Sequence, residues 1–100
     1  VMVTENGMAN DDCVGADGKV HDEKRIAFLR DYLGGVKRVV NEGIDVLGYQ
    51  HWSLMDNFEW AEGYGPRFGL IHIDYKTQKR TLKDSAYFYK KVIESNGAII

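Results

Sequence analysis

Val1-Met2-Val3-Thr4-Glu5 and Val46-Leu47-Gly48-Tyr49-Gln50-His51-Trp52-Ser53 decide the fold, because both stretches have the composition of buried β-strands. A helix is predicted between them. Asp22 is its expected N-cap and Glu42-Gly43 its expected end. A strand–helix–strand unit of this length favours two parallel strands. The helix carries one apolar stripe at three- and four-residue steps, formed by Ile26, Leu29, Leu33, Val36 and Val40.

The other segments predict loops, a hairpin and a second helix. Residues 8–21 are small, acidic and glycine-containing, so we expect an exposed loop. Residues 54–67 have no clean period and are rich in aromatic and acidic side chains. Residues 68–75 predict a strand that enters a hairpin through the polar turn at 76–79. A last helix is expected from Asp84 or Ser85, with its apolar face formed by Ala86, Tyr89, Val92 and Ile93.

Composition excludes several classes of protein. The chain has 100 residues, 13 basic against 15 acidic, so it forms one domain or less and has no basic surplus for nucleic acid. No apolar run reaches the roughly 18 residues of a membrane span. Cys13 is the one cysteine, which rules out an internal disulfide and favours a cytoplasmic setting. No charged leader precedes Val1, and the opening in mid-strand suggests a piece of a larger protein.

Two places along the chain carry chemistry. Glu5 ends a predicted strand, and in parallel α/β folds the carboxyl ends of strands carry active sites. It is either a pocket carboxylate or a solvated loop acid. The segment from Trp52 to Trp60 combines two tryptophans with Glu59. Indole faces stack on sugar rings and carboxylates accept hydrogen bonds from hydroxyls, although the same composition also suits an aromatic cluster that folds the loop onto itself.

No metal site is predicted. The cysteine and the histidines do not have the sequence spacing of metal ligands. The acids before the first helix form no complete calcium-binding loop, so we expect these acids to be solvated. We expect His51 to serve packing and Arg67 to brace the aromatic loop through a carboxylate. The side chains without ligand spacing are Cys13, His21, His51 and His72, and the acids are Asp11, Asp12 and Asp17.

Several motifs together resemble glycoside hydrolase family 1, the β-glucosidase family, and its bacterial members above all. They are Thr4-Glu5-Asn6-Gly7, the run Trp52-Ser53-Leu54-Met55-Asp56-Asn57-Phe58-Glu59-Trp60, Gly63-Tyr64 and Arg67-Phe68-Gly69-Leu70. The resemblance runs from about residue 1 to residue 97. It implies a (β/α)8 TIM barrel of which residues 1–100 are the C-terminal segment, within a single catalytic domain. Residues 1–5 and 46–53 would be its seventh and eighth strands. The helix from Asp22 would be its seventh helix and the helix from Asp84 its eighth.

The resemblance also implies roles for five residues. Glu5 matches the catalytic nucleophile of a retaining β-glycosidase, which forms a covalent glycosyl-enzyme. Trp52 matches the tryptophan stacked under the non-reducing sugar. Glu59 matches the residue that holds the 4- and 6-hydroxyls, Trp60 the one that bonds the 3-hydroxyl, and Phe68 helps close that subsite. The expected substrate is a small β-glucoside, β-galactoside or cello-oligosaccharide. Neither a cofactor nor a metal is implied.

This sequence departs from the family at one decisive point. The family's acid/base is the Glu of an Asn-Glu-Pro motif, which does not occur here. We therefore expect the 100-residue chain to be inactive without the remainder of the barrel. Glu59 would repel a 6-phosphate, so an unphosphorylated sugar is expected. Two alternatives remain, a sugar-binding pseudoenzyme and a non-catalytic barrel fragment.

Overall fold

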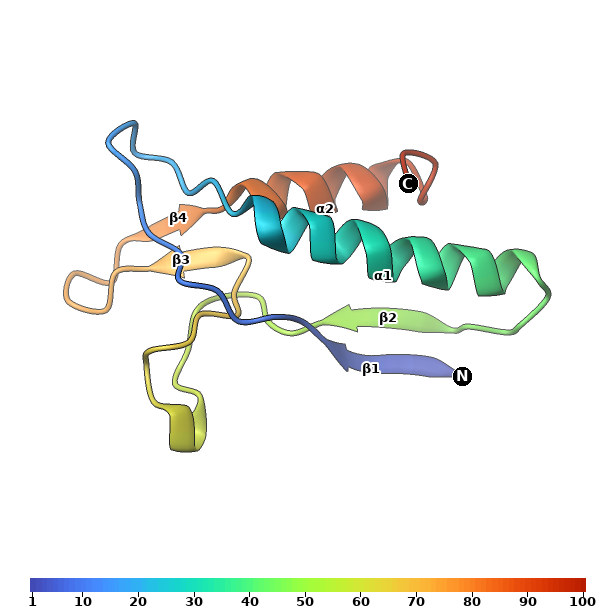
Figure 1. The fold of residues 1–100 in the computed structure, drawn as a ribbon, viewed down its shortest axis with the longest axis horizontal. Helices are drawn as coiled ribbons and strands as arrows, with labels where there is room; N and C mark the ends of the chain where they lie inside the picture. Colours follow the sequence, from blue (N-terminus) through green and yellow to red (C-terminus); the bar gives the residue numbers. More distant parts are fainter.

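The computed structural model describes residues 1–100 and follows the predicted order of elements (Figure 1). The strands are β1 (Met2–Asn6), β2 (Gly48–His51), β3 (Ile71–Ile73) and β4 (Arg80–Leu82). The helices are α1 (Glu23–Asn41) and α2 (Asp84–Glu94), and a short 3₁₀ helix, η1 (Trp60–Glu62), lies in the aromatic loop. Neither α1 nor α2 combines the length and the apolar content that a membrane-spanning helix requires.

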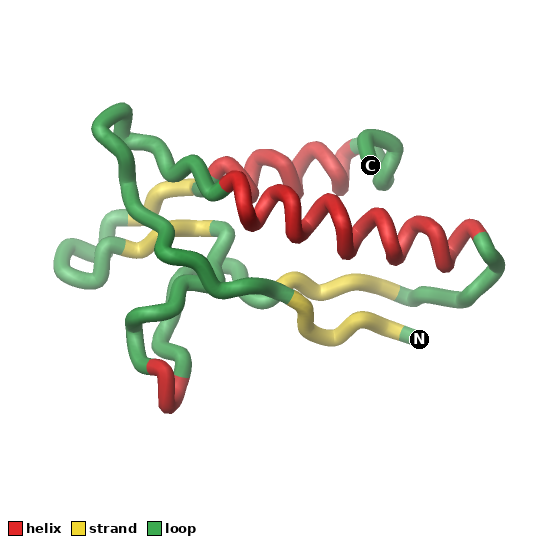
Figure 2. The backbone as a smooth tube through the Cα atoms, viewed as in Figure 1, coloured by secondary structure: helices red, strands yellow, loops and turns green.

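The two predicted strands pair in parallel, as expected. Met2 lies opposite Gly48 and Val3 opposite Tyr49, and the register shifts before Asn6 meets His51. Both helices lie on one side of this pair (Figure 2). The prediction of a buried second strand is therefore wrong for residues 1–100 alone. Tyr49 is half-buried and Leu47 is 70% exposed, because only one face of the pair is covered.

The apolar core lies between α1, α2 and the start of β3. Its fully packed members are Leu29, Leu33, Leu70, Phe88 and Val92. Leu29 and Leu33 confirm the predicted stripe of α1, but Val40 at its end is 46% exposed. The predicted face of α2 is partly wrong, because Ile93 is 63% exposed and Phe88 is buried instead. Ser85, Phe88 and Val92 share the face that meets α1, and tertiary contact selected that face among several apolar ones.

The segment before α1 differs from its prediction. Asp12 and Val20 are buried, whereas we expected an exposed loop with solvated acids. Val20 forms a parallel bridge with Lys83, and the Asp12 carboxylate reaches buried cations. The segment is therefore packed against the start of α2. Asp22 stands at the N-cap position of α1 but makes no cap hydrogen bond there, and it accepts instead from the backbone N–H of Ser85 in α2.

The hairpin is shorter than predicted. The expected strand at 68–75 is reduced to β3, which pairs antiparallel with β4 across the turn at 76–79. The Asp74 carboxylate organises this turn by accepting from the backbone N–H groups of Lys76 and Thr77. The molecule measures 47 × 32 × 18 Å and exposes 6680 Å². A monomer of this mass ordinarily exposes about 5,800 Å², so this chain carries about 900 Å² more.

Candidate functional site

The carboxyl ends of β1 and β2 meet, and Asn6, the residue after Glu5, bonds both Trp52 and Tyr49. The backbone N–H of Trp52 donates to the Asn6 carbonyl at 2.8 Å, and the Tyr49 hydroxyl donates to Asn6 Oδ1 at 2.7 Å. Glu5 is exposed, and its carboxylate makes no hydrogen bond or ion pair within the chain. A nucleophilic carboxylate must stay ionised and needs donors around it. This chain does not supply those donors.

Gly7 allows the close approach of the two strand ends. A Cβ at this position would lie 1.8 Å from the carbonyl oxygen of Trp52 and 2.9 Å from its carbonyl carbon. Both are backbone atoms, so no side-chain rotation could relieve the overlap. The Glu5-Asn6-Gly7 sequence therefore brings the backbone after β1 against the Trp52–Ser53 peptide, which is cis.

Trp52 and Glu59 form a direct pair. The indole Nε1–H of Trp52 donates to Glu59 Oε1 at 3.0 Å, and both residues are half-buried. One Glu59 oxygen is thus oriented by the indole. The bond ties the loop after β2 back to the end of that strand, so an indole and a carboxylate lie next to each other there.

Trp60 projects from a tight turn. The backbone N–H of Glu59 donates to the Gly63 carbonyl at 2.7 Å, and that of Gly63 donates to the Trp60 carbonyl at 3.1 Å. Trp60 has a positive φ of 47° and is 83% exposed. An indole held outward in this way has no packing partner within the chain and is available to a ligand or to another part of a larger protein.

Phe68 is half-buried and lies between the same loop and β3 in the sequence. Its carbonyl accepts from the backbone N–H of Ser53 at 3.1 Å, which joins the end of β2 to the segment before β3. This bond places the backbone of Phe68 against Ser53, the residue that follows Trp52. Its role in closing a sugar subsite stays a prediction.

The aromatic loop also contains the cluster that we considered as its alternative explanation. Phe58, Tyr64 and Tyr75 contact one another in series, with ring centroids 5.1 and 4.8 Å apart. The Arg67 guanidinium lies over the Tyr75 ring at 4.5 Å. The aromatic-cluster interpretation therefore holds for these rings, while Trp52 and Trp60 stay outside the cluster and their sugar-binding role stays a prediction.

Asp56 anchors the base of this loop. Its carboxylate accepts from Arg67 Nη1 at 2.6 Å and from Lys83 Nζ at 2.8 Å, and also from the backbone N–H groups of Gly69 and Ile73. Burial alone would raise the pKa of Asp56, but the hydrogen bonds from Lys83 and Arg67 outweigh it and hold that pKa below its ordinary value. The prediction that Arg67 braces the loop through a carboxylate is confirmed.

Asp56 is one end of a larger buried arrangement that sequence reasoning missed. Lys83 Nζ also contacts Asp12 at 2.6 Å, and Arg25 Nη1 contacts Asp12 and Asp22 at 2.7 Å each. Negative and positive groups alternate without a break. We call this set the buried ion chain, and its members in order are Asp22, Arg25, Asp12, Lys83, Asp56 and Arg67. The side chains are fully buried except that of Arg67, which is 18% exposed.

The histidines take separate positions. His51 packs near Tyr89, as expected, with ring centroids 6.0 Å apart, and burial lowers its pKa to about 4. His21 bonds Asp17 through Nε2 and Asp84 through Nδ1, and these bonds raise its pKa to about 8. The two acids lie on opposite sides of the ring, so they do not converge on one point as metal ligands would.

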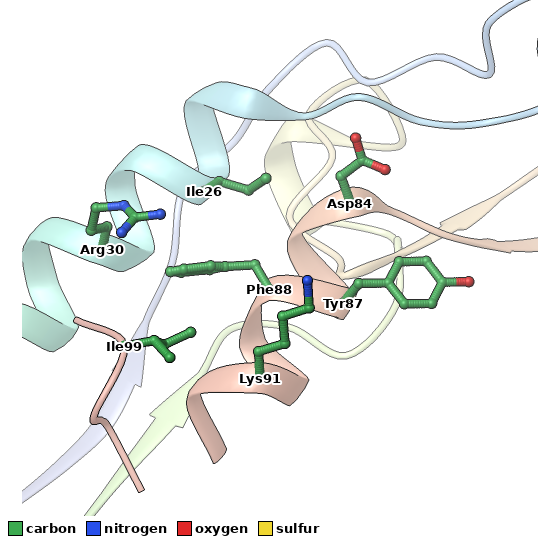
Figure 3. A pocket seen from close by; sticks show the side chains of 7 residues that line it. All are labelled: Ile26, Arg30, Asp84, Tyr87, Phe88, Lys91 and Ile99. Carbon is green, nitrogen blue, oxygen red and sulfur yellow. The ribbon is translucent and has the colours of Figure 1, made fainter. Parts of the chain in front are cut away.

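The larger clefts of the chain do not contain the predicted site residues. One of about 450 Å³ lies between α1 and α2 (Figure 3). Its walls come from the two helices and the C-terminal end, and Arg30, Asp84 and Lys91 give it a mixed charge. Glu5 and the Trp52–Glu59 pair lie instead on an open surface at the strand ends.

Comparison with known proteins matches nearly the whole chain to one family. Beta-glucosidase A of Thermotoga maritima is 53% identical over 97 residues, which are 97% of this chain and 22% of that protein. Beta-glucosidase 26 of Oryza sativa is 44% identical over 95 residues, 95% of this chain and 19% of that protein. The chain thus spans about a fifth of the length of these relatives.

Solved structures give the same result. The family 1 β-glucosidase from Thermotoga maritima superposes with a TM-score of 0.95 at 52% identity, over 97% of this chain and 22% of that one. These structural neighbours are TIM barrels. The family model of glycosyl hydrolase family 1 matches residues 1–98. Because the match in sequence and in backbone covers nearly every residue, the chain belongs to glycosyl hydrolase family 1.

Proposed function

We propose that residues 1–100 are the C-terminal segment of one (β/α)8 catalytic domain, with β1 and β2 as its seventh and eighth strands and α1 and α2 as the helices that follow them. Three observations support this. The strands are parallel and covered on one face only. The chain spans 22% of its relatives. It also exposes about 900 Å² more than an ordinary monomer of its mass.

Within that domain the proposed reaction is retaining hydrolysis of a terminal, non-reducing β-glycoside. Glu5 attacks the anomeric carbon and forms a glycosyl-enzyme, while an acid/base elsewhere in the barrel protonates the leaving oxygen and then activates water. Two carboxyl groups ~5–5.5 Å apart are required, and this chain contributes one of them.

The observation that carries the proposal is the hydrogen bond from Trp52 to Glu59, at the strand end where Trp52 also bonds Asn6, the residue after Glu5. It presents an indole face for a sugar ring and leaves the second Glu59 oxygen free to accept from hydroxyls. Trp60 and Phe68 complete the proposed subsite. A carboxylate at 59 disfavours a 6-phosphate, so the proposed sugar is unphosphorylated. Related Thermotoga maritima β-glucosidase structures contain castanospermine and noeuromycin.

The test uses the full-length enzyme that contains this segment. A 2-deoxy-2-fluoro β-glucoside with a good leaving group should inactivate it, and mass spectrometry should find the added sugar on the peptide that contains Glu5. Glu5→Gln should lower kcat on an aryl β-glucoside on the order of 10⁴-fold or more. Label on another residue, or full activity of Glu5→Gln, would contradict the assignment. Sugar binding without turnover in the unmodified enzyme would indicate a pseudoenzyme.

The isolated chain provides a second test. We expect no turnover from the purified 100 residues, because the acid/base and the donors around Glu5 are missing. Turnover that disappears in Glu5→Gln would contradict this expectation, since it would show a complete site within the chain.

A further inference from the structure

Lys83 joins the two loops that follow the parallel strands. It lies just before α2, its side chain is fully buried, and its Nζ contacts Asp12 at 2.6 Å and Asp56 at 2.8 Å. Asp12 belongs to the segment after β1, and Asp56 to the loop after β2. These partners are 71 and 27 residues from Lys83 in the sequence, so the contacts are purely tertiary.

Stability alone does not explain a buried ammonium here. Removing two opposite charges from water is costly, and well-packed apolar side chains often replace a buried ion pair with no loss of stability. What an ion pair adds is a fixed distance and direction between the groups it joins. The segment after β1 continues from Glu5, and Asp56 is three residues before Glu59. Lys83 therefore links, through side chains, the segment that follows Glu5 to the loop that carries Glu59. This link adds to the shorter route through the Asn6–Trp52 and Trp52–Glu59 hydrogen bonds.

We propose that Lys83 is a positioning residue that sets the place of Glu59 relative to Glu5, through Asp56 on one side and Asp12 on the other. The inference rests on the proposed function. One backbone contact also joins the two loops, since the Arg67 carbonyl accepts from the Asn10 N–H at 3.0 Å. The same carbonyl accepts from Arg25 Nη2 of α1 at 2.8 Å. Lys83 is the point where a cation is shared by one carboxylate from each loop.

Removal of the ammonium should move the Asp56 side of the loop. In Lys83→Met, Asp12 keeps Arg25 and Asp56 keeps Arg67, but the two carboxylates lose the cation between them. Their mutual repulsion is then unscreened in a buried place. Since a displacement near 1 Å can cost about 100-fold in rate, we expect kcat/KM on an aryl β-glucoside to fall about tenfold or more.

The distinguishing measurement is the ratio of kcat/KM values on two substrates, an aryl β-glucoside and an aryl β-xyloside. An aryl β-xyloside lacks the hydroxymethyl group whose 6-hydroxyl Glu59 is expected to hold. If Lys83 acts through Glu59, Lys83→Met should lose more activity on the glucoside than on the xyloside. The glucoside-to-xyloside ratio of kcat/KM should then fall about fivefold or more, toward the ratio of Glu59→Ala. General destabilisation would lower kcat/KM equally on both substrates and leave their ratio unchanged.

Lys37→Met is the matched control. Lys37 is a half-buried lysine of α1 whose Nζ donates to the carbonyls of Gly97 and Ile100, far along the chain from the loops. It should change thermal stability and leave the substrate ratio within about twofold of the unmodified enzyme. If Lys83→Met does not fold, Lys83→Met with Asp56→Asn removes one charge of each sign, and the ratio is measured on that variant.

The outcomes separate the two proposals. An unchanged ratio in the folded Lys83 variant, with a lowered ratio in Glu59→Ala, overturns the role of Lys83 and leaves the proposed subsite intact. An unchanged ratio in Glu59→Ala overturns the subsite assignment, and the role of Lys83 is lost with it. A lowered ratio in both, with Lys37→Met unchanged, supports both proposals.

Discussion

Gly7→Ala should separate the two strand ends that meet at the candidate site. The added Cβ would lie 1.8 Å from the Trp52 carbonyl oxygen, while ordinary contact begins at 3.4 Å. The backbone on one side must therefore move by roughly 1.6 Å to restore ordinary van der Waals contact. Glu5 moves if the end of β1 gives way, and Trp52 moves if the start of the loop does. Either displacement changes the distance between the proposed nucleophile and the proposed sugar platform.

The expected effect is larger on rate than on stability. Overpacking usually costs about 1–3 kcal/mol of unfolding free energy, which a large enzyme can tolerate. A displacement of more than 1 Å at the reacting groups can cost about 100-fold or more in kcat/KM. The assay is steady-state hydrolysis of an aryl β-glucoside by the full-length enzyme, with thermal unfolding measured on the same preparation.

Gly65→Ala is the matched control. It lies in the same loop as Glu59, and the nearest atom to its added Cβ is the Glu62 carbonyl oxygen at 3.9 Å, an ordinary contact. We expect nearly unchanged kcat/KM from this variant. Gly7→Ala with wild-type kcat/KM would refute the reasoning, and so would an equal loss in both variants.

Three further results are expected from the packing and the charges. Leu29→Ala should lower the free energy of unfolding by about 3–5 kcal/mol in denaturant titrations, because Leu29 is fully buried in the core. The pKa of Asp56 is lowered, so its stabilising effect is full above pH 3.8 and is lost as pH falls through the lower folded value; unfolding of Asp56→Asn should depend less on pH in this range. NMR should give His21 a pKa of about 8, and Asp17→Asn should return it toward 6.5. The stability that His21 provides is full below 6.5 and disappears as pH rises through about 8.

The order of elements was predictable because it depends on local periodicity. The apolar residues of α1 recur at three- and four-residue steps. The two strands are short apolar runs that border glycine or polar turns. The buried face of α2 was not predictable in the same way. Its sequence has apolar side chains on several sides, and the predicted face contained Ile93, whereas contact with α1 buries Phe88. A short helix with more than one apolar face is oriented by its neighbour and not by its own sequence.

Position and composition pointed to Glu5 and the Trp52–Trp60 segment, and the resemblance added Phe68 and the individual roles, but neither predicted the geometry. Nothing in the seven-residue spacing of Trp52 and Glu59 required the indole to donate to the carboxylate. The buried ion chain was missed for a different reason. Asp12 lies in an acidic, glycine-containing segment whose composition is typical of solvated loops, and its partner Lys83 is 71 residues away. Charge pairing over such distances leaves no periodic signal. The one local sign was the three-residue spacing of Asp22 and Arg25 at the start of α1.

The buried ion chain explains how the loops of this site can be fixed where apolar packing is thin. The fully packed apolar residues gather between the helices and at the start of β3, on one side of the β1–β2 pair. The loops are joined by the buried ion chain, which has three carboxylates and three cations whose charges cancel. Asp12 and Asp56 each lie between two cations, so each carboxylate keeps one if the other is lost. A network of this kind favours one arrangement of the loops over others, because a shifted loop would leave a charge buried without its partner. Apolar contacts tolerate small displacements far better. For the proposed site, in which Glu59 would keep a fixed distance from Glu5, discrimination between arrangements is more useful than additional stability.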